Sequence, residues 1–175
     1  FVKCIDETRR LNPHIQIEIL TPDFRGRMDI ALATLRESPP DVFNHNLESV
    51  PRLYKKIRPG ADYQWSLDLL KQFKQLYPEV PTKSGLMLGL GETEQEILAC
   101  MDDLREARVD IVTFGQYLQP TANHYPIDRY VTPAEFEQYR QWGLDKGFLE
   151  VVSGVFVRSS YRAEQVLQKN NVGLA

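Results

Sequence analysis

The feature that most constrains this chain is the alternation of strand-like and helix-like segments along almost its whole length. Residues 15–20 alternate apolar and polar side chains, whereas residues 84–90 and 109–114 are nearly continuous apolar runs, as in buried parallel strands. Shorter strands are expected at residues 42–45 and 148–152. This order predicts an α/β fold around a parallel sheet. About five parallel strands are too few for a closed eight-stranded barrel, so we expect a partial TIM-type (β/α) barrel.

Helices are expected between these strands. Thr93 and Glu96 form a capping-box pattern, and Thr132 followed by Pro133 is a typical helix start. The expected helices cover residues 1–11, 29–36, 47–57, 64–76, 93–107 and 132–147. The polar tail is expected to be irregular apart from a short helix from Ala163. We therefore divide the chain into a barrel part, residues 1–153, and a tail, residues 154–175.

Composition and charge argue against several classes of protein. The net charge is −3, whereas proteins that bind nucleic acid through its backbone are usually basic. No apolar run approaches the roughly 20 residues that span a bilayer, so no membrane segment is expected. Cys4 and Cys100 form no disulfide framework and fit a reduced, cytoplasmic protein. Because Phe1 already lies in an amphipathic helical pattern, we expect the chain to begin inside a larger protein.

Polar residues gather after the strands, where parallel α/β folds build their sites. Asn44, His45 and Asn46 follow one strand, and helix capping would explain Asn46 but not its two neighbours. Gln116 and Tyr117 follow another strand and suit either a hydrogen-bonded loop or contacts to a polar ring.

Lys83 precedes a glycine-rich stretch at residues 85–91. This stretch has neither the phosphate-loop nor the dinucleotide-binding spacing. A Schiff-base role for Lys83 remains open from the residues alone.

Seven stretches, in this order, resemble the C-terminal part of the lipoyl synthases, a family of radical S-adenosylmethionine (SAM) enzymes. The resemblance extends from about Ile15 to Tyr161. The stretches are PDFRG at 22–26, PDVFNHNLE at 40–48, RPGADY at 58–63, PTKSG at 81–85, GLGE at 89–92, GQYLQP at 115–120 and VRSSY at 157–161.

The resemblance implies an enzyme that inserts two sulfur atoms at C6 and C8 of a protein-bound octanoyl group. It implies S-adenosyl-L-methionine and two [4Fe-4S] clusters as cofactors, one cluster cleaving SAM to a radical and the other donating sulfur. The implied partners are octanoylated lipoyl carrier domains or the glycine-cleavage H protein, together with an electron donor such as flavodoxin or ferredoxin. No nucleic acid or membrane partner is implied.

The resemblance also implies roles for particular residues. Residues 85–92 match the radical SAM motif GxIxGxxE, with Met87 in place of Ile, and the motif supports the adenine. We expect Ser159 to be an oxygen ligand of the sulfur-donating cluster, with Ser160 as the adjacent alternative. The expected SAM-binding residues are Asn44, Asn46, Lys83 and Ser84 for the ribose and methionine ends, Gly89 and Glu92 in the motif, and Gln116 and Tyr117 for the adenine.

One departure from the family pattern concerns the cysteines. The family implies a CxxxCxxC motif and a second three-cysteine motif, and this sequence contains neither. Because iron–sulfur clusters need thiolate ligands, we expect the 175 residues alone to hold no cluster and to be inactive. Two alternatives stay open: a non-radical α/β-barrel enzyme that uses Lys83, and a non-catalytic binding module.

Overall fold

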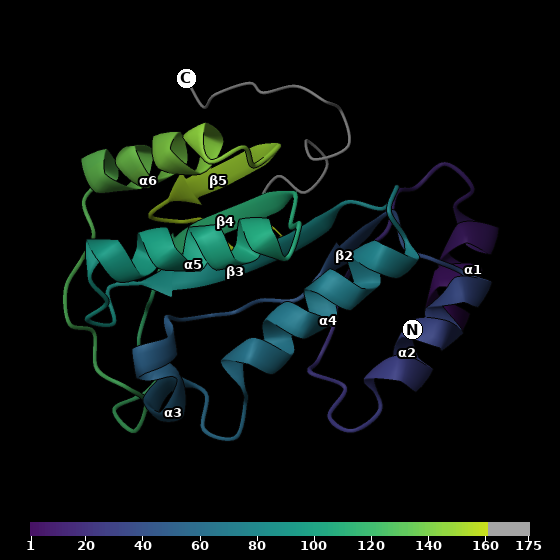
Figure 1. Cartoon of the computed structure of the whole chain (residues 1–175), viewed down its shortest axis with the longest axis horizontal. Coiled ribbons are helices and arrows are strands. Elements are labelled where there is room, and N and C mark those ends of the chain that lie inside the picture. Colours follow the sequence, from purple (N-terminus) through teal and green to yellow (C-terminus); the bar gives the residue numbers. More distant parts are fainter. Residues whose placement is uncertain (161–175) are drawn as a thin grey trace.

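Parallel strands and helices alternate along the chain in a computed structural model that describes residues 1–160 (Figure 1). The strands are β1 (Glu18–Leu20), β2 (Val42–Asn44), β3 (Thr82–Leu88), β4 (Ile111–Gln116) and β5 (Glu150–Gly154). They form one sheet in the order β1-β2-β3-β4-β5, and every neighbouring pair is parallel. The predicted five-stranded parallel sheet is therefore confirmed, and its sequential order is that of a partial barrel.

The helices return the chain from the end of one strand to the start of the next. In Figure 1, α4, α5 and α6 lie on one face of the sheet. The helices are α1 (Val2–Leu11), α2 (Met28–Thr34), α3 (Tyr54–Ile57), α4 (Tyr63–Leu76), α5 (Glu94–Glu106) and α6 (Pro133–Asp145), with 3-10 turns η1 (Leu35–Glu37) and η2 (Pro51–Leu53). The expected capping box at Thr93 with Glu96 is present, and Thr132, expected as a helix start, forms a second capping box with Glu135.

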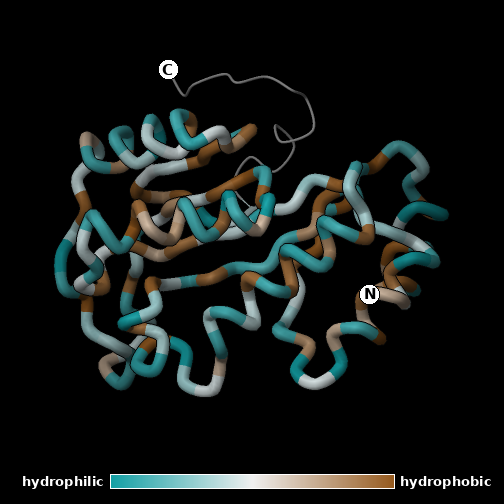
Figure 2. Tube along the Cα trace, in the orientation of Figure 1, coloured by the Kyte–Doolittle hydropathy of each residue, from teal (hydrophilic) through white to brown (hydrophobic). Residues whose placement is uncertain are grey.

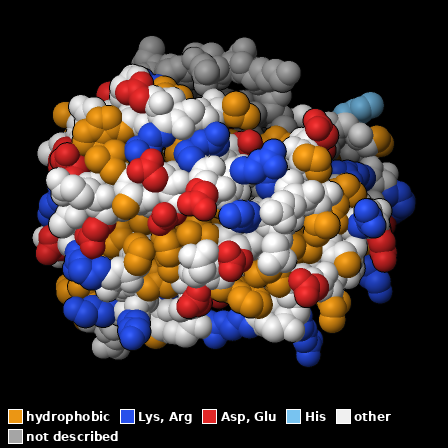
Figure 3. Space-filling model, in the orientation of Figure 1, with side chains coloured by type: hydrophobic (Ala, Val, Ile, Leu, Met, Phe, Trp, Pro, Cys, Tyr) orange, Lys and Arg blue, Asp and Glu red, His pale blue; other side chains and the backbone are white. Residues whose placement is uncertain are grey.

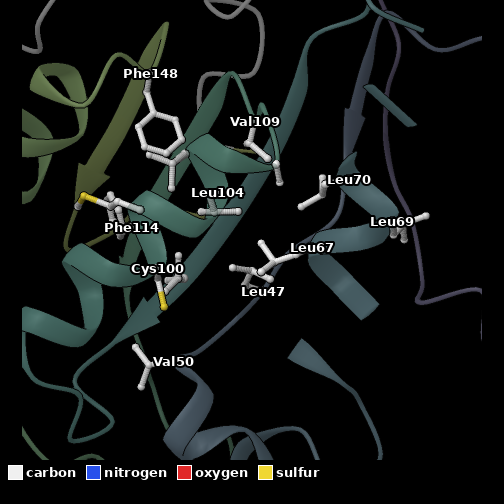
Figure 4. Close-up of a cluster of buried hydrophobic side chains, with 14 of the residues drawn as sticks. Leu47, Val50, Leu67, Leu69, Leu70, Cys100, Leu104, Val109, Phe114 and Phe148 are labelled. Carbon is white, nitrogen blue, oxygen red and sulfur yellow. The ribbon is translucent and has the colours of Figure 1, made fainter. Parts of the chain in front are cut away.

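The hydrophobic core lies between the sheet and these helices. Leu86 and Leu88 of β3 and Phe114 of β4 belong to it, and brown segments mark the hydrophobic residues of strands and helices alike in Figure 2. Cys100 and Leu104 project from α5 into the same cluster (Figure 4). Cys100 is a buried core residue, and this burial raises the pKa of its thiol to about 12.

The sequence prediction was wrong for residues 47–50, which are not helical; the helical segment starts only at η2. These residues instead continue alongside β3, because Glu48 N–H donates to Gly85 O at 2.8 Å and Met87 N–H donates to Glu48 O at 2.9 Å. Glu48 has φ +68, which a continuing helix excludes. Asn46 is consequently not a helix cap.

The remaining differences concern the ends of elements. β1 covers only the last three residues of the expected strand at 15–20, and β3, β4 and β5 are displaced by about two residues from their expected positions. The expected boundary after residue 153 falls at the end of β5. Tyr161 and the helix expected from Ala163 lie outside the described residues.

The outer surface shows no dominant charge on the face of Figure 3, where acidic and basic side chains are interspersed. The mixture of charges on this face agrees with the low net charge of the chain. Within residues 1–160, no helix is long and apolar enough to cross a membrane.

The aromatic stack between β2 and α4 should contribute strongly to stability. The rings of Phe43 and Phe73 lie 3.8 Å apart and nearly parallel, and both are fully buried. We expect Phe73→Ala to lower the free energy of unfolding by about 3–5 kcal/mol, because it opens a cavity in the core. Leu76→Ala, at an exposed position of the same helix, should change it by about 0.5 kcal/mol. Urea unfolding measures both values, and equal losses would contradict this placement of the core.

Candidate functional site

A cavity of about 330 Å³ lies on the face of the sheet opposite the core. Side chains alternate along a strand, so Gly85 and Met87 of β3 line the cavity while Leu88 packs into the core. The cavity is lined by Leu20, Asn46, Glu48, Gly85, Leu86, Met87, Thr113, Gly115, Gln116, Tyr117, Leu118, Pro120, Val157, Arg158 and Ser159. A separate cavity of about 370 Å³ beside α4 is lined by none of the predicted site residues.

Asn46 and Glu48 enter the cavity from an irregular continuation of β2. His45 N–H donates to Lys83 O, and Glu48 N–H donates to Gly85 O. The chain therefore advances three residues, from 45 to 48, while β3 advances two, from 83 to 85, and the extra residue makes a β-bulge. Asn46 Nδ2 donates to Glu48 Oε1 at 3.1 Å, and this bond fixes which end of the amide faces the carboxylate. The buried Asn46 Oδ1 therefore remains as an acceptor with no partner among the described residues.

Glu48 is an acid in a dry environment. Burial raises the pKa of its carboxyl above the ordinary value, against the hydrogen bond from Asn46 and the positive charge of Arg58. Sequence reasoning did not select Glu48, although it closes the PDVFNHNLE stretch. No periodic signal marks it, because its direction depends on the bulge.

A second carboxylate–amide pair lies deeper in the sheet. Asn44 Nδ2 donates to Glu18 Oε1 at 2.9 Å, which leaves the buried Asn44 Oδ1 without a partner in the part of the chain described. Lys83 is fully buried, and its Nζ donates to both carboxylate oxygens of Glu18, at 3.1 and 3.0 Å, and to Ser159 O at 2.5 Å.

This environment bears on the expected roles of Lys83. Its ammonium group already has three acceptors and does not line the cavity, which disfavours both a Schiff base and a direct contact to SAM. Glu18 was not selected from the sequence. Its only signal is a polar position in the alternating pattern of residues 15–20.

The bulge is supported from behind by charged residues of two of the seven stretches. Arg58 donates to Asp23 Oδ1 at 3.1 Å and to the main-chain oxygen of Asn46 at 3.2 Å. Burial lowers the pKa of His45, so the ring is neutral, and its Nδ1 lies 2.9 Å from Thr21 O. With the proton on Nδ1, Nε2 is an acceptor that lies 3.3 Å from Asp23 without a hydrogen bond.

Gly89 and Glu92 form a turn after β3 rather than part of the cavity lining. Glu92 accepts hydrogen bonds from Gly89 N–H at 2.6 Å and from Leu90 N–H at 2.9 Å. Gly89 has φ +94, and a side chain there would also meet Gln116 Nε2 and Arg129 O at 2.4 Å. Both residues thus shape the edge of the site.

Gln116 and Tyr117, at the end of β4, differ in whether their side chains remain available to a ligand. The Gln116 side chain is occupied, since Nε2 donates to Arg129 O at 3.2 Å and Oε1 accepts from Val131 N–H at 2.8 Å. The hydroxyl of Tyr117 donates to Tyr125 O at 2.8 Å, and the residue lines the cavity. Tyr117 is therefore the one of the two that remains available to a ring ligand.

The predicted serine positions differ in where they lie. Ser84 is buried away from the cavity lining, and its hydroxyl accepts from Leu47 N–H at 3.2 Å. Ser159 lines the cavity, whereas Ser160 is exposed and does not. No group of three or more His, Cys, Asp or Glu residues that could hold a metal ion occurs among residues 1–160. Neither cysteine lines the cavity: Cys4 is exposed on α1 and Cys100 is buried in the core.

Comparison with known proteins gives a consistent result. Residues 2–115 match the family model of the radical SAM superfamily. Proteins named lipoyl synthase are similar over nearly the whole chain: that of Thioalkalivibrio sulfidiphilus is 62% identical over 169 residues, 97% of this chain and 53% of the relative. The lipoyl synthase of Pasteurella multocida is 61% identical over 164 residues, 94% of this chain and 51% of the relative. The chain thus spans about half the length of these curated relatives.

The raised pKa of Glu48 has a consequence for stability. A carboxyl whose pKa is higher in the folded state than its ordinary 4.5 destabilises the fold as pH rises through the folded-state value. At pH 7 we expect Glu48→Gln to have a larger free energy of unfolding than the natural protein. This difference in stability should shrink as the pH is lowered toward 4. Glu79→Gln, at an exposed position outside the cavity, is the control variant. Chemical unfolding at several pH values measures these free energies. A difference in stability between Glu48→Gln and the natural protein that does not change with pH would refute the burial effect.

Proposed function

The chain belongs to the radical SAM superfamily. We propose that it is part of a lipoyl synthase, an enzyme that inserts sulfur at C6 and C8 of a protein-bound octanoyl group. The observation that carries the proposal is the 62% identity to a lipoyl synthase over 97% of this chain. Because the chain covers about half of that relative, the activity is proposed for the complete protein.

The geometry supports this function because four of the seven stretches line one cavity and the other three contact them from behind. Asp23, Arg58 and His45 bring three of them together behind the bulge. Gly89 packs against Gln116, and Lys83 contacts Ser159, so the other four stretches are linked in two pairs. Such an arrangement is expected if the stretches serve one site.

One side of the cavity offers an unpaired hydrogen-bond acceptor that suits the donor groups of SAM. Asn46 Oδ1 is buried and without a partner among the described residues, and an unpaired buried acceptor is costly unless a ligand supplies a donor. The ribose hydroxyls and the ammonium group of SAM are such donors. We assign Asn46 to this role, with Glu48 orienting its amide and Tyr117 offering an aromatic face near the adenine.

When bound, SAM supplies the radical chemistry, and the residues of this chain bind, orient and keep water out. Leu20, Met87 and Leu118 give the cavity an apolar side that suits an alkyl chain such as the octanoyl group. The proposed partners are the octanoylated lipoyl carrier domains or the H protein, and an electron donor such as flavodoxin or ferredoxin. We propose that the complete protein works in the cytoplasm.

Iron–sulfur clusters fit this chain only in part. Ser159 stands on the cavity wall, and its hydroxyl has no hydrogen-bond partner within residues 1–160, so it fits as an oxygen ligand. The two cysteines lie elsewhere, and the sequence has no others. We therefore propose that the thiolate ligands of both clusters come from residues outside these 175.

The function and the role of Asn46 are tested together on the full-length protein with both clusters reconstituted. With SAM, a reductant and an octanoylated carrier, mass spectrometry of the carrier should show the lipoyl group; unmodified carrier would sink the proposal. Asn46→Ala should weaken SAM binding about tenfold or more, measured by titration calorimetry, because the acceptor is lost. Asn123→Ala, an exposed asparagine in the loop after β4, should bind SAM as the natural protein does.

The role of Ser159 has its own test. Ser159→Ala leaves three thiolates, so we expect the iron content to be largely retained and SAM cleavage to persist, while lipoyl product per 5′-deoxyadenosine falls severalfold. If the serine only capped a helix, the change would be worth about 1 kcal/mol of stability, with no effect on this ratio. Full lipoyl yield from the Ala variant would refute the ligand role, and a loss confined to Ser160→Ala would move it by one residue.

A further inference from the structure

The segment after β5 forms one wall of the cavity by lying directly on the sheet. Val157, Arg158 and Ser159 all line the cavity. A side chain at Gly115 of β4 would place its Cβ 2.3 Å from Val157 O, so the close approach needs glycine. Shape alone, however, does not hold a segment in place.

The ammonium group of the buried Lys83 anchors this segment to the sheet through a hydrogen bond. The Lys83 side chain has no exposed surface, and its Nζ donates to Ser159 O at 2.5 Å and to both oxygens of Glu18 at 3.1 and 3.0 Å. Glu18 also accepts from Asn44 Nδ2 at 2.9 Å. One side chain thus joins β1, β3 and the segment that carries Ser159.

This arrangement is not explained by stability alone. A buried ion pair is costly to desolvate, and an apolar pair of similar volume often stabilises a fold equally well or better. The carboxylate of Glu18 neutralises the lysine but leaves its third hydrogen for a neutral carbonyl. The carbonyl that receives it is that of Ser159, a residue that lines the cavity and whose hydroxyl has no hydrogen-bond partner among residues 1–160.

We propose that Lys83 is a positioning residue: with Glu18 as its counter-charge it fixes the main chain at Ser159 and so sets where the Ser159 hydroxyl stands in the cavity. The inference deepens the proposed function and rests on it for the role of the hydroxyl. The hold on the main chain is a separate, structural claim.

The structural claim is measured by limited trypsin digestion of the full-length protein. Arg158 has an exposed side chain, and cleavage after it requires the segment to leave the sheet. In Lys83→Met we expect cleavage between Arg158 and Ser159 to be about tenfold faster or more, because a charged hydrogen bond is lost. Ser159→Ala keeps the carbonyl, so its cleavage rate should match that of the natural protein.

Lys74 of α4 provides a matched control, because none of its contacts involves the segment after β5. It is also a nearly buried lysine, bonded to Asp110 Oδ2 at 2.8 Å and to Val80 O at 3.2 Å. Lys74→Met should lower overall stability without faster cleavage after Arg158. Equal acceleration in the two variants would mean general loosening and would overturn the proposal. If Lys83→Met does not fold, Lys83→Gln, too short to reach Ser159 O, takes its place with the same expectation.

The functional arm compares lipoyl product with 5′-deoxyadenosine. Lys83→Met should lower this ratio severalfold, as Ser159→Ala does, while SAM binding stays unchanged. An unchanged ratio with faster cleavage would overturn the positioning role. If the natural protein makes no lipoyl product but the cleavage rates differ as expected, the proposed function fails and the hold on the main chain stands.

Discussion

The alternation of side chains along β3 is the constraint on which the other features depend. In a parallel sheet covered by helices on one face, successive residues must serve two environments. Leu86 and Leu88 enter the core with α4 and α5, and Gly85 and Met87, which alternate with them along the strand, turn to the cavity. A slip of one residue would bury the cavity lining under helices and expose the core, so the register that stabilises the fold also builds the site.

Two carboxylates orient two amides by the same physical rule. An ionised carboxylate only accepts hydrogen bonds, so the amide nitrogen must face it and the amide oxygen must face away. Glu48 does this for Asn46, and Glu18 does it for Asn44. Both amide oxygens are buried without partners among residues 1–160, at a cost that a ligand with hydroxyl or ammonium donors would offset.

Much of the fold could be predicted from the sequence, because capping boxes and apolar runs are local signals. The prediction failed at residues 47–50, where Glu48 follows β3 instead of starting a helix. The site was harder, since the direction of a side chain depends on its partners. Sequence periodicity does not predict the hydrogen bond between Ser84 and Leu47 or the one by which Glu92 closes its own turn. Nor does it predict that Lys83 binds Glu18 and Ser159. Four of the seven stretches contribute residues to the cavity lining, and only the structure separates these lining residues from supporting ones.

The central claim is that the inner face of the sheet is a preformed SAM site. The most direct measurement is a crystal structure of the full-length protein with SAM bound. The account predicts the ribose or ammonium donors of SAM within hydrogen-bond distance of Asn46 Oδ1, with the Asn46–Glu48 bond intact and the Ser159 main chain still held by Lys83. SAM bound elsewhere, or an Asn46 amide turned away to a protein partner, would contradict it.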